Sequence, residues 1–182
     1  MAVRIKPVKL EEATPKQREA LEATRAALGK VPGLYATFGQ APDVLEALLR
    51  FQGALQKGGL TARDRDLIDL HVSQLNGCAY CVSAHTAFAK ANKLSETDIL
   101  RIRDGQGETP RDAAILGLAR RVAKSGGLGA VAEIAQAREA GLSDPQIVEV
   151  IAATGFRSLI NAVALAAGTE IDWPRAPRIP EA

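Results

Sequence analysis

The chain has 182 residues, of which 47% are hydrophobic and 4% aromatic, and its 23 basic and 21 acidic side chains leave a formal net charge of +2. This length fits one domain whose core is large enough to fold without disulfide bonds, so residues 1–182 are treated as a single domain. No long basic run marks a nucleic-acid surface, the N-terminal residues lack the apolar segment of a signal peptide, and the apolar run at 159–167 is too short for a membrane span. We therefore expect a cytoplasmic protein that binds neither nucleic acid nor a membrane.

Helix-capping signals divide the sequence. Residues that favour the N-cap position stand three places before a glutamine or an aspartate at Thr14, Thr61, Ser95, Thr109 and Ser143. The helices expected from these caps and from glycine-containing turns cover residues 15–28, 34–40, 43–57, 62–75, 78–91, 96–103, 110–124, 128–140 and 144–167. No segment alternates as a β-strand does. The sequence therefore predicts an all-α fold, a helical bundle.

Two of these helices have surfaces that favour contacts with a second copy of the chain. The apolar stripes on 43–57 and 144–167 are broad and rich in alanine, which favours close packing against other helices and predicts a homo-oligomer. The last stretch, 169–182, is rich in proline and is expected to be extended. We expect this tail either to be packed by Trp173 or to lie on a neighbouring subunit.

The segment 76–85 holds both cysteines of the chain, Cys78 and Cys81, together with His85. In a helix, spacings of three and four residues place these side chains on one face. Cys78 is expected in the first turn, where free amides and the helix dipole favour a thiolate. Cys81 is expected to meet His85, which can accept a thiol proton. This arrangement suits a redox centre in which one cysteine becomes a sulfenic acid and the other condenses with it to a disulfide.

Two other interpretations of the cysteines stay open. They can be small core residues, since free cysteine is among the most buried residue types. They can also form a Cys₂His₂ zinc site with His85 and His71, the latter from the preceding helix. Because no second paired motif exists and the chain is large enough to fold without a metal, we expect neither a metal nor another cofactor. His71 by itself is interpreted as a partly buried histidine with a backbone hydrogen bond.

The helix before the cysteines begins with a charged run. Its members are Arg63, Asp64, Arg65, Asp66 and Asp69. Taken by itself, this run is typical of a solvated charged face.

The segments LTARDRD (60–66), QLNGCAYC (74–81) and AHT (84–86) resemble the alkylhydroperoxidase AhpD-like proteins of the carboxymuconolactone decarboxylase superfamily. The likeness is strongest over the redox motif region 60–95. It implies an all-helical fold assembled into trimers, hexamers or related oligomers. It also implies a thiol peroxidase of antioxidant defence that reduces organic hydroperoxides, with a disulfide that a dithiol protein or small dithiol reduces again.

The same resemblance assigns roles to individual residues. Cys81 would be the peroxidatic cysteine, Cys78 the resolving cysteine and proton donor, and His85 part of the proton relay. Asp66 stands where the family has a relay glutamate, and the shorter side chain would need a bridging water or a shifted helix. Tyr80 stands where the best-characterised members have a second histidine, and tyrosine is a poor base near neutral pH but can donate a hydrogen bond.

A different class of function remains as an alternative. The pair could serve a redox-sensing or disulfide-exchange protein that has no significant peroxide turnover. The lactone decarboxylation that gives the superfamily its name does not call for a cysteine pair, which argues against that activity here.

Overall fold

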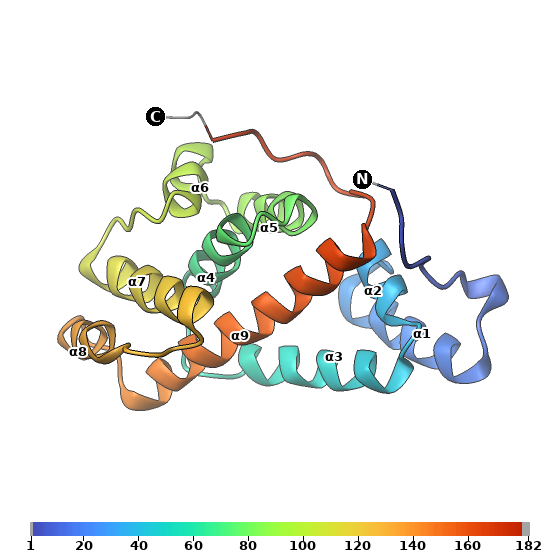
Figure 1. Ribbon diagram of the computed structural model, residues 1–182, viewed down its shortest axis with the longest axis horizontal. Helices are drawn as coiled ribbons and strands as arrows, with labels where there is room; N and C mark the ends of the chain where they lie inside the picture. The colour runs from blue at the N-terminus through green and yellow to red at the C-terminus, as the bar shows by residue number, and fades with distance from the viewer. Residues whose placement is uncertain (1, 180–182) are drawn as a thin grey trace.

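The computed structural model describes residues 2–179, and in this range it contains nine α-helices, one short 3₁₀ turn and no β-strand (Figure 1). The elements are the 3₁₀ turn Leu10–Glu12, α1 (Pro15–Leu28), α2 (Gly33–Phe38), α3 (Pro42–Gln56), α4 (Ala62–Leu75), α5 (Ala79–Ala91), α6 (Glu96–Arg103), α7 (Pro110–Ser125), α8 (Val131–Glu139) and α9 (Asp144–Ala167). The all-α prediction is confirmed. Four predicted helices, 15–28, 62–75, 96–103 and 144–167, have the observed bounds, and the others differ by a few residues.

The predicted N-caps are confirmed because each cap side chain accepts a hydrogen bond from the backbone N–H three residues later. The largest difference in bounds is at α8, which begins at Val131 instead of residue 128. Gly127 and Gly129 take positive φ angles of 87° and 74° just before it. Because such angles cannot continue a right-handed helix, the turn extends to Ala130.

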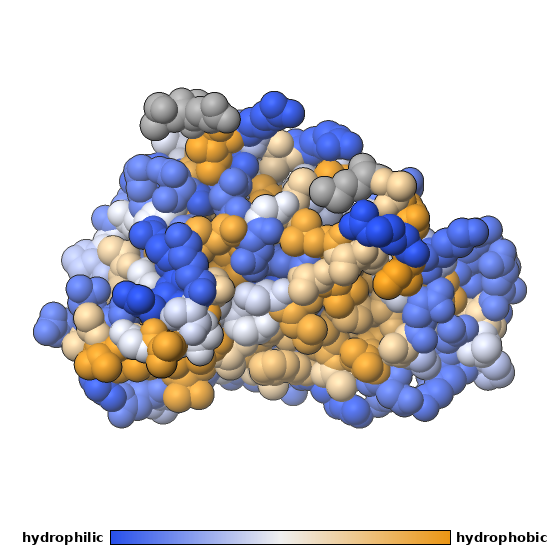
Figure 2. Space-filling model, viewed as in Figure 1, coloured by the Kyte–Doolittle hydropathy of each residue, from blue (hydrophilic) through white to orange (hydrophobic). Residues whose placement is uncertain are grey.

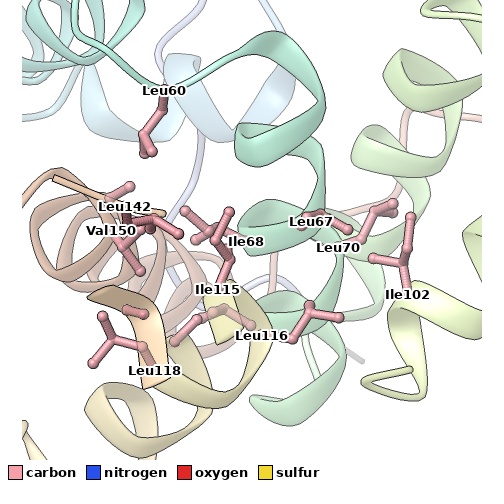
Figure 3. Close-up of a cluster of buried hydrophobic side chains, with 14 of the residues drawn as sticks. Leu60, Leu67, Ile68, Leu70, Ile102, Ile115, Leu116, Leu118, Leu142 and Val150 are labelled. Atoms are coloured by element: carbon pink, nitrogen blue, oxygen red, sulfur yellow. The ribbon is translucent and has the colours of Figure 1, made fainter. Parts of the chain in front are cut away.

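Helices α4 and α9 lie at the centre of the molecule and contact each other. In Figure 1, α9 runs obliquely across the middle of the fold, and it packs against α4 and α7 at one end and against α2 and α5 towards the other. One hydrophobic cluster joins α4, α7 and α9 through residues such as Ile68, Leu116 and Val150 (Figure 3). A second cluster contains side chains of α1, α2 and α3, of the start of α5 and of the C-terminal half of α9. The two cysteines lie in this second cluster, so the candidate redox pair is part of a packed core.

The 24-residue helix α9 has a mean hydropathy of 1.6 over its most apolar 18-residue window, which by length and composition would allow a membrane span. Half of that window is buried inside the fold, and its inner face carries the buried polar residues Arg157 and Asn161. Contacts with α4 and α7 account for its apolar character. We therefore interpret α9 as the central core helix.

The charged run at the start of α4 is not a solvated face, so that interpretation is wrong for its central residues. Asp64 is 3% exposed and Asp66 is 6% exposed. Asp64 accepts hydrogen bonds from Arg111 of α7 and from the backbone of Thr61. Asp66 accepts a hydrogen bond from Asn92 just after α5. Arg111 and Asn92 come from later parts of the chain, which is why the run itself does not reveal these contacts.

The chain after α9 is extended, as predicted, and packs on its own protomer. The indole of Trp173 contacts the ring of Phe88, with 5.0 Å between ring centroids, and the ammonium of Lys30 lies 3.5 Å from the indole centroid. Further along, the backbone N–H of Ala176 donates to Ser83 Oγ at 3.2 Å. The tail therefore crosses α5 towards α6 (Figure 1). Residues 180–182 of the predicted tail lie outside the described residues.

Candidate functional site

The turn between α4 and α5 holds the first cysteine. Gly77 takes a positive φ of 66°, a conformation that glycine adopts at low cost, and the N–H of Cys78 then donates to the carbonyl of Ser73 at 3.0 Å. Cys78 is the N-cap of α5 and not a residue of its first turn, because the helix begins at Ala79, one residue later than predicted. Its Sγ accepts a hydrogen bond from the backbone N–H of Cys81 at 3.3 Å.

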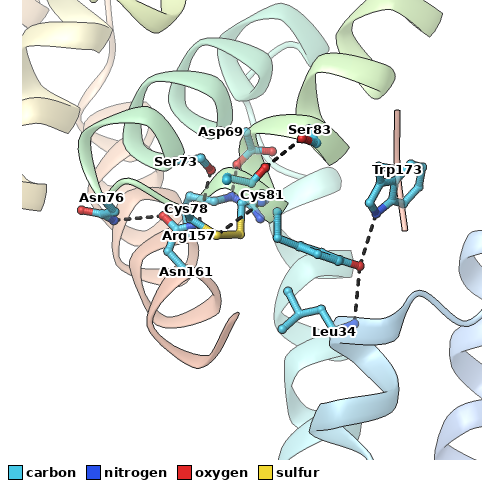
Figure 4. The surroundings of a disulfide bond; sticks show 12 residues. Leu34, Asp69, Ser73, Asn76, Cys78, Cys81, Ser83, Arg157, Asn161 and Trp173 are labelled. Carbon is cyan, nitrogen blue, oxygen red and sulfur yellow. Dashed lines mark hydrogen bonds and ion pairs between the residues drawn. A yellow bond between two sulfur atoms is a disulfide. The ribbon is translucent and has the colours of Figure 1, made fainter. Parts of the chain in front are cut away.

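Polar side chains fix this turn to α9. Asn76 Nδ2 donates to Asn161 Oδ1 at 2.9 Å, and Asn161 Nδ2 donates to Ser73 Oγ at 3.3 Å (Figure 4). Asn161 is 1% exposed. Because buried amides are costly without partners, these bonds restrict the position of the turn and of the cysteine that follows it.

Cys78 and Cys81 are joined by a disulfide, with Cα atoms 5.3 Å apart (Figure 4). The two residues are 1% and 2% exposed. On reduction, the free amides and dipole of the α5 N-terminus would favour a thiolate at Cys78. The burial agrees with the interpretation of the pair as core residues, but the disulfide adds the redox chemistry that a core role does not need.

His85 lies one turn after Cys81 on α5 and has a carboxylate and a guanidinium close to it. The Oδ2 atom of Asp69, on α4, is 3.4 Å from His85 Nδ1. Its other oxygen, Oδ1, accepts a hydrogen bond of 2.7 Å from Arg157 Nε on α9. Three helices therefore supply one side chain each to the polar cluster of His85, Asp69 and Arg157, and its carboxylate and guanidinium lie beside the disulfide in Figure 4.

The electrostatics of this cluster favour a neutral imidazole. Burial, followed by repulsion from Arg157, lowers the pKa of His85 to about 4, although Asp69 acts in the opposite direction. Burial also opposes the charge of Asp69, but Arg157 and then His85 hold the pKa of that carboxyl below its usual range. At neutral pH, His85 is therefore a neutral base next to an ionised carboxylate, which can stabilise the imidazolium once a proton arrives.

The carboxylate that contacts His85 is Asp69, three residues after Asp66. Asp66 is directed to Asn92, and burial, followed by the charge of Asp69 among the nearby groups, raises the pKa of the Asp66 carboxyl. Both aspartates line the same cavity with His85. The structure thus joins Cys78 to Cys81 and places Cys81 and His85 in the lining of one cavity, while Cys78 lines a different one. Asp66 lies near His85 without the direct contact that Asp69 makes.

Two neighbouring cavities open beside His85. The first, of about 60 Å³, is lined by Cys81 and His85 with a mainly apolar and aromatic wall, and we call it the Cys81 cavity. The second, of about 460 Å³, is lined by Asp66, Asp69 and Arg65, and we call it the Asp69 cavity. Both cavities share their lining at Leu28, Gln52, His85, Phe88 and Arg157. They therefore form a small inner compartment at the sulfur and a larger outer one.

Tyr80 lies between the cysteines and has a structural position. Its hydroxyl accepts hydrogen bonds from the backbone N–H of Leu34 at 3.4 Å and from Trp173 Nε1 at 3.2 Å. Burial raises the pKa of this phenol, so it is neutral at physiological pH. Tyr80 therefore links α5 to α2 and to the tail, and it does not replace a histidine base.

His71 belongs to a different part of the molecule. Its Nδ1 lies 3.2 Å from the carbonyl oxygen of Arg103, and the residue is 1% exposed, which confirms the predicted backbone contact. It lines a separate cavity with Arg120 and Lys124, whereas His85 lines the cavities described above. Among residues 2–179, no group of three or more potential metal-ligating side chains is arranged to bind a metal ion.

The sequence interpretation missed Asp69 and Arg157 as site residues. A signal for Arg157 was present, because it is the only charged residue between positions 150 and 167 of an apolar helix. Charged residues in such a position are usually paired. Asp69 lacked such a signal, because it is one of several charged residues in its segment. Only the packing of α4 against α5 and α9 brings this aspartate to His85 and Arg157.

Comparison with known proteins gives a consistent picture of the fold. Residues 42–125 match the carboxymuconolactone decarboxylase family. The uncharacterized protein YdfG of Bacillus subtilis is 33% identical over 58 residues, which are 32% of this chain and 38% of that protein. The chain thus spans less than two-fifths of the length of this curated relative.

Solved structures cover nearly the whole chain. An uncharacterized peroxidase-related protein from Ralstonia eutropha, described as an alkylhydroperoxidase AhpD core, has a TM-score of 0.80 and 26% identity, with 94% of each chain covered. The debrominase Bmp8, crystallised with 2,3,4-tribromopyrrole, has a TM-score of 0.78 at 18% identity, with 94% of this chain and 93% of that one covered. The second likeness is one of fold alone.

Proposed function

The chain is an AhpD-like member of the carboxymuconolactone decarboxylase superfamily, and from this premise we propose that it is a thiol-dependent peroxidase. Its substrates are organic hydroperoxides, and its redox centre is the pair Cys81 and Cys78. The observation that carries the proposal is the shared lining of one cavity by Cys81 and His85, with Asp69 in contact with the imidazole. An activated thiol next to an oriented base is what peroxide reduction requires.

The reaction starts from the reduced pair. His85 accepts the proton of the Cys81 thiol, and the thiolate attacks the terminal oxygen of the hydroperoxide. The O–O bond breaks, the alkoxide takes the proton back from His85, and an alcohol leaves while Cys81 becomes a sulfenic acid. The Cys78 thiolate then attacks the Cys81 sulfur and displaces hydroxide, which takes a proton to become water. One hydroperoxide is thereby reduced by two electrons, and the disulfide holds the oxidising equivalents.

His85 and Asp69 have separate roles in this scheme. The low pKa of His85 keeps the imidazole ready to accept a proton at neutral pH. Asp69 is the positioning residue, because its carboxylate faces Nδ1 and stabilises the imidazolium while the proton is held. Arg157 fixes Asp69 through the Nε–Oδ1 hydrogen bond.

The cavities suit a hydroperoxide with an apolar body. The Cys81 cavity, at about 60 Å³, has room for roughly two waters, which is enough for a peroxide group. The Asp69 cavity, at about 460 Å³, would hold the organic part against Phe88, Phe156 and Leu55. A cytoplasmic location would fit this chemistry, because cytosolic reductants restore the dithiol after each turnover.

The proposal is tested with pre-reduced protein and one equivalent of cumene hydroperoxide, with peroxide and free thiols followed together. We expect two thiols to disappear for each peroxide consumed. Cys81→Ser should leave the peroxide intact, whereas Cys78→Ser should still consume it, with loss of the single thiol of Cys81. Peroxide consumption by Cys81→Ser at the parent rate would contradict the proposal.

A redox sensor or disulfide-exchange protein is the second candidate, and the complete burial of the disulfide in the core favours it. Opening the disulfide inside a packed cluster would loosen the surrounding contacts. This function predicts thiols that survive cumene hydroperoxide but exchange with dithiols. It also predicts a change in thermal stability between the oxidised and reduced forms.

A further inference from the structure

The disulfide has two sides, and each sulfur lines its own cavity. The Cys81 cavity includes Cys81 but not Cys78. A different cavity of about 520 Å³, which we call the Cys78 cavity, includes Cys78 but not Cys81. Its walls are the turn at Gly77, the first residue of α5, Ala79, and the chain from Ala164 to Arg175. Tyr80 is the residue that lines both cavities and separates them.

We propose that the reducing dithiol enters through the Cys78 cavity and attacks the Cys78 sulfur, while the hydroperoxide uses the opposite side of the disulfide. This inference rests on the proposed function, since it names the entrance and the chemistry of the reductant for the same redox pair.

The direction of thiol–disulfide exchange supports this assignment. A thiolate displaces the leaving sulfur from the opposite side, so the attacking sulfur approaches Cys78 from the side away from Cys81. The mirror-image attack on Cys81 would have to bring a sulfur and its carbon chain through a space of about 60 Å³, which holds roughly two waters, less room than the Cys78 side offers. The Cys78 cavity, at about 520 Å³, is large enough for a dithiol.

The steps balance as follows. The first thiolate of the reductant bonds to Cys78 Sγ, the S–S bond breaks, and Cys81 leaves as a thiolate that takes up a proton. The second thiol of the reductant loses its proton and attacks the reductant sulfur of the mixed disulfide. Cys78 then leaves as a thiolate at the N-terminus of α5, where the helix dipole stabilises it. The dithiol loses two electrons and two protons to become a disulfide.

The walls also indicate the charge of the reductant. The Cys78 cavity adjoins a space of about 620 Å³ under the tail, and the two share Gly77, Ala79, Ile171 and Arg175. This adjoining space adds Arg103 and Arg178, and no acidic side chain among residues 2–179 lines it. Glu170 is the acidic residue in the lining of the Cys78 cavity. Three arginines against one glutamate attract an anion, so the matching partner is a dithiol with acidic groups near its sulfurs.

The first test blocks the entrance. Ala79 is exposed at the start of α5 and lines the Cys78 cavity, so Ala79→Phe should fill the entrance without disturbing the core. We expect reduction of the disulfide by dithiothreitol to slow about tenfold or more, because access of the thiolate controls the rate. Oxidation of the pre-reduced variant by cumene hydroperoxide should stay within about twofold of the parent rate, since peroxide uses the other cavity. Parent-like reduction, or equal slowing of both half-reactions, would overturn the proposal.

The second test examines charge. Reduction by meso-2,3-dimercaptosuccinate, which carries two carboxylates, is compared with reduction by the uncharged dithiothreitol. Arg175→Glu should lower the ratio of these two rates about tenfold. Arg18→Glu makes the same charge change at an exposed site on α1 that lines neither cavity, and it should keep the parent ratio. An unchanged ratio in Arg175→Glu would overturn the proposed acidic partner.

The reduction steps of both tests start from the disulfide form, which can be prepared with diamide. These steps therefore remain valid if cumene hydroperoxide fails to oxidise the pair. That failure would reject the peroxidase function, whereas parent-like reduction of Ala79→Phe would reject the entrance.

Discussion

At the scale of single residues, the chemistry of the site depends on which carboxylate contacts the imidazole of His85. The resemblance assigned this role to Asp66, at the position of the family's glutamate, but the side chain in contact with Nδ1 belongs to Asp69. The two positions are three residues apart and lie on the same side of α4. A shorter acid at position 66 is thus accompanied by a second acid one turn later that reaches the imidazole directly.

This difference gives the first residue-scale prediction. Asp69→Asn should slow oxidation of the pre-reduced thiols by cumene hydroperoxide about tenfold or more, because the imidazolium loses its stabilising charge. Asp66→Asn should stay within about threefold of the parent rate, since its contact is with Asn92. The rates are measured by stopped-flow on variants with parent-like circular dichroism.

A merely structural role of Asp69 is distinguished by the titration of His85. The chain has two histidines, so the His85 signal in a proton NMR titration is assigned by comparison with His85→Gln. Loss of the carboxylate should lower the pKa of His85 further in Asp69→Asn, because Arg157 then acts without opposition. Equal slowing by the two aspartate variants, with no movement of the His85 pKa, would argue against the assignment.

Site residues close together in the sequence could be predicted, whereas those far apart in the sequence could not. Cys78, Cys81 and His85 lie within one helix and its cap, so their spacing alone placed them together. Asp69 and Arg157 come from other helices, 88 residues apart from each other. Their meeting depends on how α4 and α9 pack, which local pattern does not specify.

At the scale of elements, the tail and α5 hold the site together. Trp173 contacts Phe88 and Lys30 and donates to the hydroxyl of Tyr80, the residue that separates the two sides of the disulfide. The sequence predicted an extended tail with two possible positions, because proline excludes a helix but does not select a surface. The aromatic contacts on α5 select the position on the same chain.

The second prediction concerns this contact. Trp173→Ala should lower the free energy of unfolding by about 1–3 kcal/mol, because it removes the ring contacts, the cation–π contact and one hydrogen bond. Trp173→Phe keeps an aromatic ring and should lose less. Urea denaturation followed by circular dichroism measures both values, and parent-like stability of Trp173→Ala would show that the tail does not fasten α5.

Helix bounds were predictable where a cap or a glycine fixes them. The caps at Thr14, Thr61 and Ser143 marked α1, α4 and α9 correctly. The start of α8 was not predictable in the same way, since Ala130 provides no side-chain cap. There the positive φ angles of the preceding glycines decide the boundary.

At the scale of the whole molecule, the fold buries titratable groups that the unfolded chain exposes. An unfolded histidine binds its proton near pH 6.5, whereas folded His85 binds one only near pH 4. Burial lowers the pKa of His71 in the same direction. Between these pH values the unfolded chain holds more protons, so acidification favours unfolding.

The third prediction is therefore a loss of stability from pH 6.5 towards pH 4. His85 alone should account for about 3 kcal/mol of the free energy of unfolding across this window. In His85→Gln this part of the slope should disappear, while the part due to His71 stays. The lowered pKa of Asp69 acts only at still lower pH. A pH-independent free energy of unfolding in the parent, measured by urea denaturation, would contradict the prediction.

The homo-oligomer stays a prediction, and exposed hydrophobic residues on the surface indicate where a second copy would pack. Hydrophobic residues gather over α9 and beside α3 on the face shown in Figure 2. Exposed members on these two helices include Val44, Phe51, Val148 and Leu159. A second copy packed on this face would cover them, as the broad stripes in the sequence indicate.

In the proposed peroxidase reaction, Cys81, in the cavity of His85, is the residue that reacts with the hydroperoxide. The most direct measurement is to treat Cys78→Ser with one equivalent of cumene hydroperoxide in the presence of dimedone and to locate the adduct by peptide mass spectrometry. We expect one dimedone adduct on Cys81 in this protein, and none on Cys78 in the matching Cys81→Ser protein. An adduct on Cys78 in Cys81→Ser, with Cys81 unmodified in Cys78→Ser, would contradict it.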